Sequence, residues 1–409
     1  MNSHTTIETS GPDLGSPAEV PNRSTWPTFG EDEVQAACDV LRSGKVNALH
    51  HGAQNEAFEK AMADLCGVPH AIAVANGTLA LELALHALGI GAGDEVIVPA
   101  RSFMATASCV IACGARPVFA DVDRVSQNIT ASTIEAALTA NTKAIIVVHL
   151  AGWPCEMADI MELAERRDLR VIEDCAQAHG ALIDGQPVGS FGDAAAFSFC
   201  TDKIISTAGE GGMMVTRHRD CWKKAWAYKD HGKDPDNYAG IVPGPDFLYL
   251  HDSLGSNFRL TEMQAAIGLL QIGKLDDRLA ARRSNAAAIE AELAGVPAIR
   301  LMQPRDGVEH ARYKYYVAIR PEMLRDGWER RHIIENAAAA GLPCSTGSCP
   351  EIYLEPAFEG YELAPDQRLP VARELGETTI MLQVDHTLTT DDCRAAGRIL
   401  KYIVELAMR

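Results

Sequence analysis

The 11 cysteines of this 409-residue sequence show no paired CxxC spacing and are scattered along the chain. Cys109 and Cys113 stand four residues apart in an apolar run typical of a helix, so we interpret them as core thiols rather than metal ligands. An odd number of cysteines with no Cys-dense short region predicts reduced thiols instead of a disulfide framework.

Long apolar runs are also missing. No stretch approaches the roughly 20 apolar residues that a membrane-spanning helix needs, and the first residues lack a hydrophobic leader. Together with reduced thiols, these features predict a cytoplasmic protein.

Positive charge is scarce: 37 Lys and Arg residues face 55 Asp and Glu residues, which gives a net charge of −18. Such a balance disfavours nonspecific binding to nucleic acid or to anionic membranes. An anionic substrate would need a local cluster of cationic groups. The 47% hydrophobic and 22% charged residues are typical of a globular protein, and the length allows more than one domain.

The chain divides into three predicted parts. Residues 1–23 have almost no large apolar side chains and are predicted to be a disordered tail. Residues 24–270 alternate strands with helices, a pattern that predicts an α/β domain with a mostly parallel sheet. A long helix from Thr261 to about Leu293 is predicted to link the large domain to a smaller α+β domain, and residues 271–409 hold most of this linking helix and the smaller domain.

The segment FSFCTDKIISTAGEGGMMVT (197–216) predicts a strand, an exposed turn and a second strand. Lys203 stands on the turn, and the GEGG sequence follows it. Thirty residues upstream, an apolar strand ends in Glu173 and Asp174, which should point to opposite faces. Near residue 76, AVANGT leads from a strand into a helix, whose first N–H groups can bind a phosphate. A lysine, a carboxylate at a strand end and such a helix start are the parts of a pyridoxal phosphate site.

Four motifs, NGT, EDCAQAHGA, SFCTDK and GEGG, together resemble the DegT/StrS family of sugar aminotransferases. These are pyridoxal-phosphate enzymes of the fold-type-I (aspartate aminotransferase-like) class. The resemblance runs from about Trp26 to Met408, with the motifs in the family's order. It implies a large α/β domain that binds the cofactor and a small C-terminal α+β domain.

The resemblance implies a role for each matching residue. Lys203 would bind the cofactor aldehyde covalently, and Asp174 would keep the pyridine nitrogen protonated; these two would be the catalytic residues. The other cofactor contacts would be Gly77, Thr78 and Ser198 at the phosphate, Phe103 stacked on the ring, Gln177 near the 3-oxygen, and Asn257 at the phosphate of a neighbouring subunit. That last contact would make the enzyme a homodimer with shared sites.

Several of these residues have a second interpretation. Gly77-Thr78 is also a common helix cap, Phe103 could pack in the core, and Asn257 could only shape the loop before a helix that begins at Thr261. His179 either supports Asp174 or is a core histidine. In the family, the segment that contains His50 and His51 extends to the active site, so these histidines either contact the substrate or lie in a solvated loop.

The implied reaction transfers an amino group from an amino acid, expected to be L-glutamate, to a keto sugar. A nucleotide-linked 3- or 4-ketosugar is favoured because YKDHGK, STGSCPEIYLEPAF and LPVARELGETTIML resemble the branch that makes surface polysaccharide sugars. A keto-inositol acceptor is the alternative. A pyridoxamine-phosphate-dependent sugar dehydratase is a further one, which Lys203 argues against because those members replace the lysine. No metal site is expected.

Overall fold

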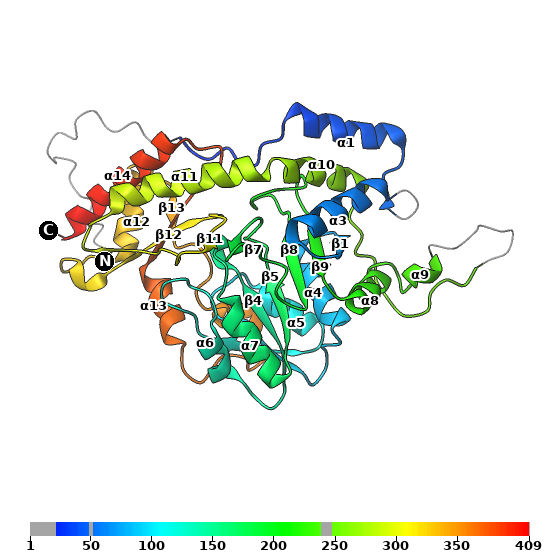
Figure 1. Cartoon of the computed structure of the whole chain (residues 1–409). Helices are drawn as coiled ribbons and strands as arrows, with labels where there is room; N and C mark the ends of the chain where they lie inside the picture. The colour runs from blue at the N-terminus through cyan, green and yellow to red at the C-terminus, as the bar shows by residue number, and fades with distance from the viewer. Residues whose placement is uncertain (1–21, 49–51, 239–247, 409) are drawn as a thin grey trace.

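The computed structural model of the chain describes residues 22–48, 52–238 and 248–408. Its centre is a seven-stranded sheet with the order β1-β9-β8-β5-β4-β2-β3 (Figure 1). Only β9 runs against the other six strands, because it pairs antiparallel with both β1 and β8. The prediction of a mostly parallel α/β sheet is therefore confirmed. The strands are β1 (His70–Val74), β2 (Glu95–Pro99), β3 (Arg116–Ala120), β4 (Thr142–Val148), β5 (Arg170–Asp174), β8 (Ala194–Ser198) and β9 (Gly212–Thr216).

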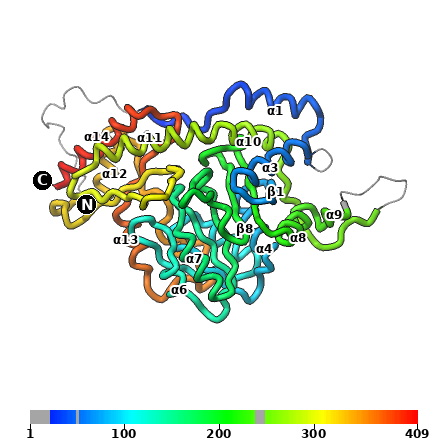
Figure 2. The backbone as a smooth tube through the Cα atoms, in the orientation of Figure 1, coloured from blue at the N-terminus to red at the C-terminus, as the bar shows by residue number. Residues whose placement is uncertain are grey.

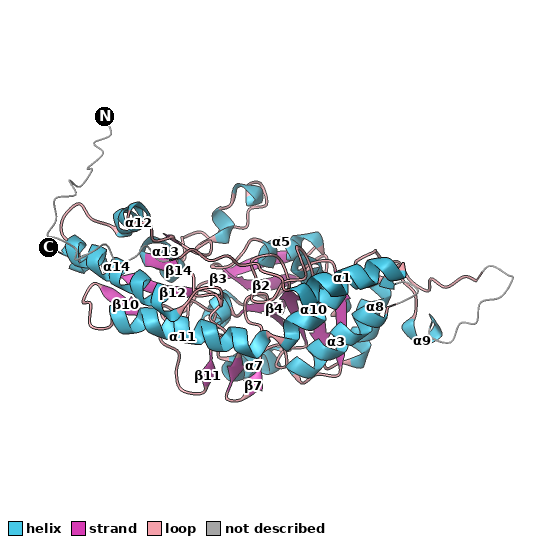
Figure 3. Ribbon diagram, turned by 90° about the horizontal axis from the view of Figure 1, so that it is seen from above, coloured by secondary structure: helices cyan, strands magenta, loops and turns pink. Residues whose placement is uncertain are grey.

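Helices cover both faces of this sheet, as Figure 3 shows from above. Alternate residues of a strand point to opposite faces, and in β4 Ile146 joins one core while Ile145 and Val147 join another. The strands are therefore almost continuously apolar, as expected of a parallel sheet buried on both sides. One face carries α4 (Gly77–Ala87), α5 (Ala105–Ala112) and α8 (Arg219–Lys229); the other carries α3 (Ala53–Cys66), α6 (Ala131–Ala137), α7 (Met157–Arg167) and α10 (Glu262–Gly273).

The C-terminal part forms a second, antiparallel sheet with the order β10-β12-β14-β13. Its strands are β10 (Ile299–Leu301), β12 (Tyr315–Ile319), β13 (Cys344–Ser345) and β14 (Thr379–Leu382). One face packs with α11 (Leu275–Leu293), α12 (Arg330–Ala339) and α14 (Thr390–Met408) in a separate core. The opposite face, through Tyr316 and Ala318, joins the core of the large sheet next to α13 (Pro370–Thr378). Elements far apart in sequence therefore share one core.

A three-stranded antiparallel sheet, β11-β6-β7, is the third. It joins β6 (Leu182–Ile183) and β7 (Gln186–Pro187), just after β5, to β11 (Val308–Glu309). The tube in Figure 2 shows α1 (Glu31–Ser43) lying above α10. Beyond α8, the short helix α9 (Pro235–Tyr238) stands away from the body of the molecule (Figure 1).

The predicted single helix from Thr261 to Leu293 is wrong in one respect. The structure has two nearly collinear helices, α10 and α11, separated at Lys274, whose φ and ψ are −101° and 1°. Gly273 precedes the break, and glycine costs about 1 kcal/mol in a helix interior. The Lys274 ammonium bonds Asp32 and Glu33 of α1, both at 2.7 Å. The capping of α10 by Thr261, through the Gln264 N–H, is confirmed.

The division at residues 23 and 270 stays a prediction, and residues 1–21 lie outside the described residues. At the start of the described chain, Asn22 N–H donates to Asp392 at 3.2 Å, and Thr25 N–H donates to Thr387 at 3.0 Å. The chain just before α1 is thus attached to the start of α14. No helix in the described part of the chain is long and apolar enough to cross a membrane.

Two helical glycines provide a test of this packing. A Cβ on Gly397 of α14 would lie 2.9 Å from Cβ of Glu292 and 3.2 Å from the Ile289 carbonyl of α11, whereas one on Gly273 would meet nothing within 4 Å. Gly397→Leu should lower the free energy of unfolding by about 1–3 kcal/mol through overpacking. Gly273→Ala should raise it by about 0.5–1 kcal/mol. Urea denaturation measures both, and equal effects would contradict the α11–α14 packing.

Candidate active site

The carboxyl ends of the parallel strands meet at one edge of the large sheet, where open α/β sheets bind ligands. β5 and β8 are neighbours, with Asp174 paired opposite Ala196, so Asp174 lies beside the strand end that carries Ser198. The predicted site residues follow different strands: Gly77 and Thr78 after β1, Phe103 after β2, Asp174 and Gln177 at and after β5, Ser198 and Lys203 at and after β8. The fold thus brings all seven to the same edge.

The start of α4 forms a cradle of backbone N–H groups. Asn76 caps the helix by accepting from Leu79 N–H at 3.0 Å. The N–H groups of Gly77 and Thr78 belong to the first turn, where N–H groups have no partner within the helix and can donate to an external acceptor. A Cβ on Gly77 would lie only 2.7 Å from Cβ of Ser198, and one on Gly212 would lie 2.2 Å from the Asn76 carbonyl. Both glycines are therefore needed for the close approach of the three segments.

This cradle fits a phosphate group. The N–H groups of the first turn, the positive end of the α4 dipole and the hydroxyls of Thr78 and Ser198 are features that bind phosphate at helix N-termini. The GEGG glycines shape the turn after Lys203: Gly212 packs on Asn76, and a Cβ on Gly211 would overlap the Thr207 hydroxyl.

Asp174 is a buried carboxylate, 7% exposed. Its Oδ1 accepts from Ala176 N–H at 3.2 Å, and its Oδ2 accepts from the Thr106 hydroxyl at 3.1 Å. Burial raises the pKa of Asp174, while the Ala176 N–H, the charge of Lys203 and Thr106 oppose that rise. A buried carboxylate without a cation is costly, so the site fits a cofactor that brings its own positive charge.

Glu173, the neighbouring residue, points to the other face of the sheet, as strand alternation predicts. It is fully buried, and its carboxylate accepts four hydrogen bonds. Three come from the N–H groups of Gly189, Phe191 and Gly192, at 2.8–2.9 Å, in the loop after β7. The fourth involves His149 Nε2 at 3.1 Å. Glu173 is therefore a structural carboxylate, which supports the choice of Asp174 for the cofactor.

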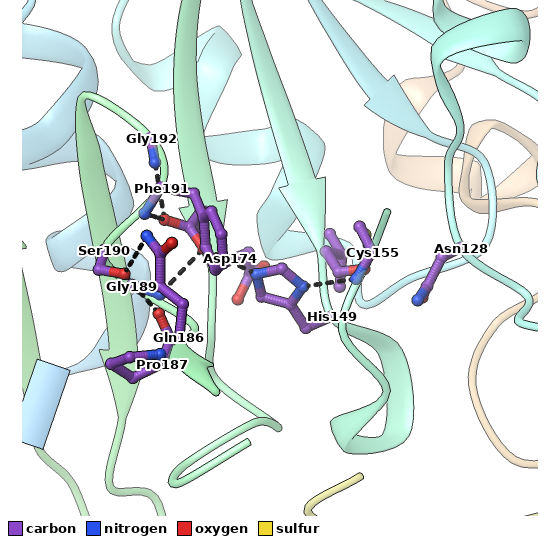
Figure 4. A network of polar contacts seen from close by, with 12 residues as sticks. Asn128, His149, Cys155, Asp174, Gln186, Pro187, Gly189, Ser190, Phe191 and Gly192 are labelled. Atoms are coloured by element: carbon purple, nitrogen blue, oxygen red, sulfur yellow. Dashed lines mark hydrogen bonds and ion pairs between the residues drawn. The ribbon is translucent and has the colours of Figure 1, made fainter. Parts of the chain in front are cut away.

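His149 extends this network toward the loop after β4 (Figure 4). Its Nδ1 accepts from the N–H of Cys155 at 3.0 Å, so the ring proton is on Nε2, which donates to Glu173. His149, Glu173 and Cys175 are close enough to hold a metal ion. The carboxylate is already satisfied, however, and burial raises the pKa of the Cys175 thiol well above its ordinary value, so the cluster fits a hydrogen-bond network around an ionised Glu173 better than a metal centre.

Lys203 is placed by contacts to its backbone and to its side chain. Trp26 Nε1 donates to the Lys203 carbonyl at 2.8 Å, so the segment before α1 borders the site. The Lys203 ammonium lies 3.9 Å from Asp202 Oδ1 and 5.1 Å from the ring centre of Tyr313. The Tyr313 hydroxyl in turn donates to Asp202. Tyr313 comes from the C-terminal part of the chain, so both parts contribute to the surroundings of the lysine.

The structure decides several of the open interpretations. Phe103 is 67% exposed, so it is not a core residue. Gln177 Oε1 accepts from Ala151 N–H at 2.7 Å, which leaves its NH₂ group to face a ligand.

His179 is fully buried, and within the described residues neither ring nitrogen has a hydrogen-bond partner. It packs on Phe197 and Phe199, and burial lowers its pKa to about 3. His179 therefore does not support Asp174.

Asn257 lies in an exposed segment that pairs with Asp230. Next to it, Ala75 N–H donates to the Phe258 carbonyl at 2.9 Å, so this segment borders the β1 end of the sheet. His50 and His51 lie outside the described residues. Sequence reasoning assigned no role to Thr106, Trp26, Asp202 and Tyr313. Only Asp202, directly before the lysine, carried a signal that could have found it.

Comparisons with known proteins agree with this geometry. A model of the DegT/DnrJ/EryC1/StrS aminotransferase family matches residues 27–401. The chain belongs to this family. It is an aminotransferase of the fold-type-I class, and pyridoxal phosphate is its cofactor. The family resemblance and the cofactor prediction are thereby confirmed.

Individual relatives narrow the comparison. The GDP-perosamine synthase of Caulobacter vibrioides is 48% identical over 237 residues, which is 58% of this chain and 61% of that enzyme's length. The L-glutamine:2-deoxy-scyllo-inosose aminotransferase of Streptomyces fradiae is 32% identical over 405 residues, which is 93% of this chain and 95% of that enzyme's length. A solved aminotransferase from Psychrobacter cryohalolentis is 44% identical, with a TM-score of 0.92 over 95% of this chain and 100% of that one.

Glu173→Gln should lower the free energy of unfolding by about 3 kcal/mol, because an amide cannot accept four hydrogen bonds. Burial alone would raise the pKa of Glu173, but His149 and the N–H groups of Gly192 and Gly189 bring it below the ordinary value of 4.5. The charge therefore stabilises the fold above pH 4.5, and this contribution is lost as the pH falls through the lower, folded-state pKa.

Urea denaturation at pH 7 and at pH 4 measures the effect, and the difference between wild type and Glu173→Gln should shrink at the lower pH. Glu135, whose exposed carboxylate pairs with Arg167, provides the control: Glu135→Gln should change the free energy by less than about 1 kcal/mol. A Glu173→Gln protein as stable as this control would contradict a structural role for the network.

Proposed function

We propose that this aminotransferase moves an amino group from L-glutamate to the keto group of a nucleotide-linked sugar, at position 3 or 4 of the ring. The single observation that supports amino transfer most directly is the meeting of Lys203, Asp174 and the α4 cradle at one sheet edge. The nucleotide-sugar acceptor is supported by the GDP-perosamine synthase at 48% identity.

Pyridoxal phosphate, when bound, supplies an aldehyde that takes up the amino group and a pyridinium ring that withdraws electrons. Lys203 Nζ would hold the cofactor through its aldehyde carbon and, when free, would take a proton from the donor α-carbon; the same residue would act in both half-reactions. Asp174 would keep the ring nitrogen protonated, and Gly77, Thr78 and Ser198 would bind the phosphate. Phe103 would stack on the ring, and the NH₂ group of Gln177 would donate to the 3-oxygen.

Two alternatives differ in the substrate or the reaction. A keto-inositol acceptor is supported by the 2-deoxy-scyllo-inosose aminotransferase, which matches nearly the whole chain and whose name gives L-glutamine as donor. A pyridoxamine-phosphate-dependent dehydratase is disfavoured by Lys203. Nucleotide-linked 3- and 4-ketosugars and keto-inositols, each with glutamate and with glutamine, separate these activities when the keto acid product and the aminated acceptor are followed. Activity only with a keto-inositol would refute the nucleotide-sugar proposal.

The protein should work as a homodimer in which Asn257 contacts the cofactor phosphate of the neighbouring subunit. The segment around Asn257 is supported as an interface by Leu254, which is 93% exposed, since exposed apolar side chains on a projecting segment favour contact with a partner. A second copy of this chain is the partner that we propose. The cytoplasm is the proposed location.

Borohydride reduction of the protein loaded with pyridoxal phosphate should fix the cofactor to a single peptide, with the added mass on Lys203. Lys203→Ala should bind pyridoxal phosphate without a covalent link and lose turnover by several orders of magnitude, because the covalent attachment and the proton transfer are lost together. Peptide mass spectrometry locates the adduct. The assignment fails if the adduct is on another lysine, such as Lys314, whose ammonium lies 4.9 Å from the ring centre of Tyr313.

Mixing Lys203→Ala with Asn257→Ala subunits tests the shared site. In a mixed dimer both changes fall in one site, and the other site keeps Lys203 and Asn257 intact. Activity should rise above that of either variant alone, toward about a quarter of the wild-type activity if subunits exchange at random, because half of the dimers then have one intact site.

Asn257→Ala by itself must be strongly impaired for this experiment to apply, and subunit exchange is verified with differently tagged chains. Sedimentation in the same buffer shows whether the active species is a dimer. An active monomer, or verified exchange with no gain in activity, would mean that Asn257 acts only within its own subunit.

A further inference from the structure

Thr106, in the first turn of α5, contacts the carboxylate of Asp174 directly. Its hydroxyl lies 3.1 Å from Asp174 Oδ2 and 2.8 Å from the hydroxyl of Ser102. Thr106 and Ser102 are each 1% exposed, so both hydroxyls are removed from bulk solvent. The three side chains form a buried chain of hydrogen bonds that ends on the group proposed to hold the cofactor ring.

The directions of these hydrogen bonds follow from the chemistry of the groups. An ionised carboxylate can only accept, so the single proton of the Thr106 hydroxyl points to Asp174. Thr106 Oγ then has only lone pairs to offer Ser102, and the Ser102 hydroxyl must donate to it. Aligned hydrogen bonds in a buried chain polarise one another. Ser102 therefore strengthens the hydrogen bond that Thr106 makes to Asp174.

This arrangement also leaves Asp174 oriented for a further donor. Oδ2 accepts from Thr106 and Oδ1 from Ala176 N–H, whereas an ionised carboxylate has about four lone-pair sites. The two fixed bonds define the plane of the carboxylate, and the free lone pairs can accept from a ring N–H. Lys203 and His149 also lie near Asp174, and both act to lower the pKa of its carboxyl group.

Ser102, the first residue of this series of hydrogen bonds, lies in the loop between β2 and α5. Contacts on several sides hold that loop in place. Arg101, 1% exposed, donates to Gln127 at 2.9 Å and to Thr379 of β14 at 3.0 Å. Ser102 pairs through its backbone with Cys349, and the Ala100 carbonyl accepts from Ile352 N–H at 2.9 Å. The next residue after Ser102 is the exposed Phe103. The loop between β2 and α5 is thus fixed to the C-terminal part of the chain.

We propose that Thr106 is a positioning residue of the aminotransferase site: its hydroxyl orients Asp174 and, through Ser102, ties that carboxylate to the loop that carries Phe103. Ring protonation and ring stacking then depend on one connected unit. The inference rests on the proposed role of Asp174 toward the ring nitrogen.

Pyridoxal phosphate labelled with ¹⁵N in the ring, bound to the full-length protein, tests this proposal by NMR. Thr106→Val keeps the side-chain shape but leaves Oδ2 without its hydroxyl donor. The buried carboxylate, with one donor fewer, then depends more strongly on the ring N–H. The pH at which the ring nitrogen loses its proton should therefore rise by about one unit, which corresponds to a tenfold change in the equilibrium constant and is the size expected when a hydrogen bond to a charged group is lost. Thr106→Ser restores the hydroxyl and should titrate like wild type.

Thr378→Val is the matched control, because Thr378 is also buried and its hydroxyl donates only to the Glu374 carbonyl of its own helix. It should leave the ring titration unchanged. Ser102→Ala removes the donor to Thr106 and should shift the titration in the same direction as Thr106→Val, by a smaller amount. If Thr106→Val does not fold, Ser102→Ala provides the test.

Asp174→Asn separates the two levels of the proposal. If the ring nitrogen titrates in Asp174→Asn as it does in wild type, the assignment of Asp174 in the proposed function is wrong. If Asp174→Asn changes the titration while folded Thr106→Val and Ser102→Ala do not, only the positioning role of Thr106 is refuted. A shift in Thr106→Val that Thr106→Ser does not restore would also refute it, because the effect would then come from packing.

Discussion

Burial of a carboxylate at the end of β5 is the constraint on which much of the site depends. Removing the charge of Asp174 from water is unfavourable unless donors and a cation surround it. The structure supplies Ala176 N–H and the Thr106 hydroxyl as donors, and the charge of Lys203 as a partial counter-charge. In the proposed function, the pyridinium of the cofactor completes this environment. A site built in this way binds the charged ring in preference to a neutral one, which is the property that an electron-withdrawing cofactor needs.

The two adjacent acids of β5 show how one strand serves two purposes. Asp174 faces the ligand edge, while Glu173 faces the opposite side and holds Gly189, Phe191 and Gly192 through their N–H groups. His149 joins the same carboxylate to the loop after β4. The hydrogen-bond network of Glu173, on one face of the sheet, therefore holds the end of β5 in place, and the same strand end presents Asp174 on the opposite face. Strand alternation makes this division possible, since neighbouring side chains cannot reach the same face.

The C-terminal part of the chain contributes to the site rather than only covering it. Tyr313 bonds Asp202 next to the lysine, and Thr379 holds Arg101 in the loop that precedes Phe103. Tyr316 and Ala318 join the core of the large sheet. Because both sheets share packing and polar contacts, a change in the second sheet can alter the cofactor environment without touching a cofactor ligand.

The sequence by itself determined the α/β class and placed Lys203, Asp174, Ser198 and the NGT turn at or just after the ends of predicted strands. Apolar periodicity and glycines at turns are local information and suffice for these positions. The roles of these residues come from the family resemblance and stay predictions. The sequence did not determine the break at Lys274, which depends on ion pairs to α1, or the isolation of His179 between two phenylalanines. Sequence reasoning also assigned no role to Thr106, Trp26 and Tyr313, because their partners lie 68 or more residues away. Only the tertiary structure decides such contacts, since they arise where the packing of the sheets and the meeting of strand ends bring distant segments together.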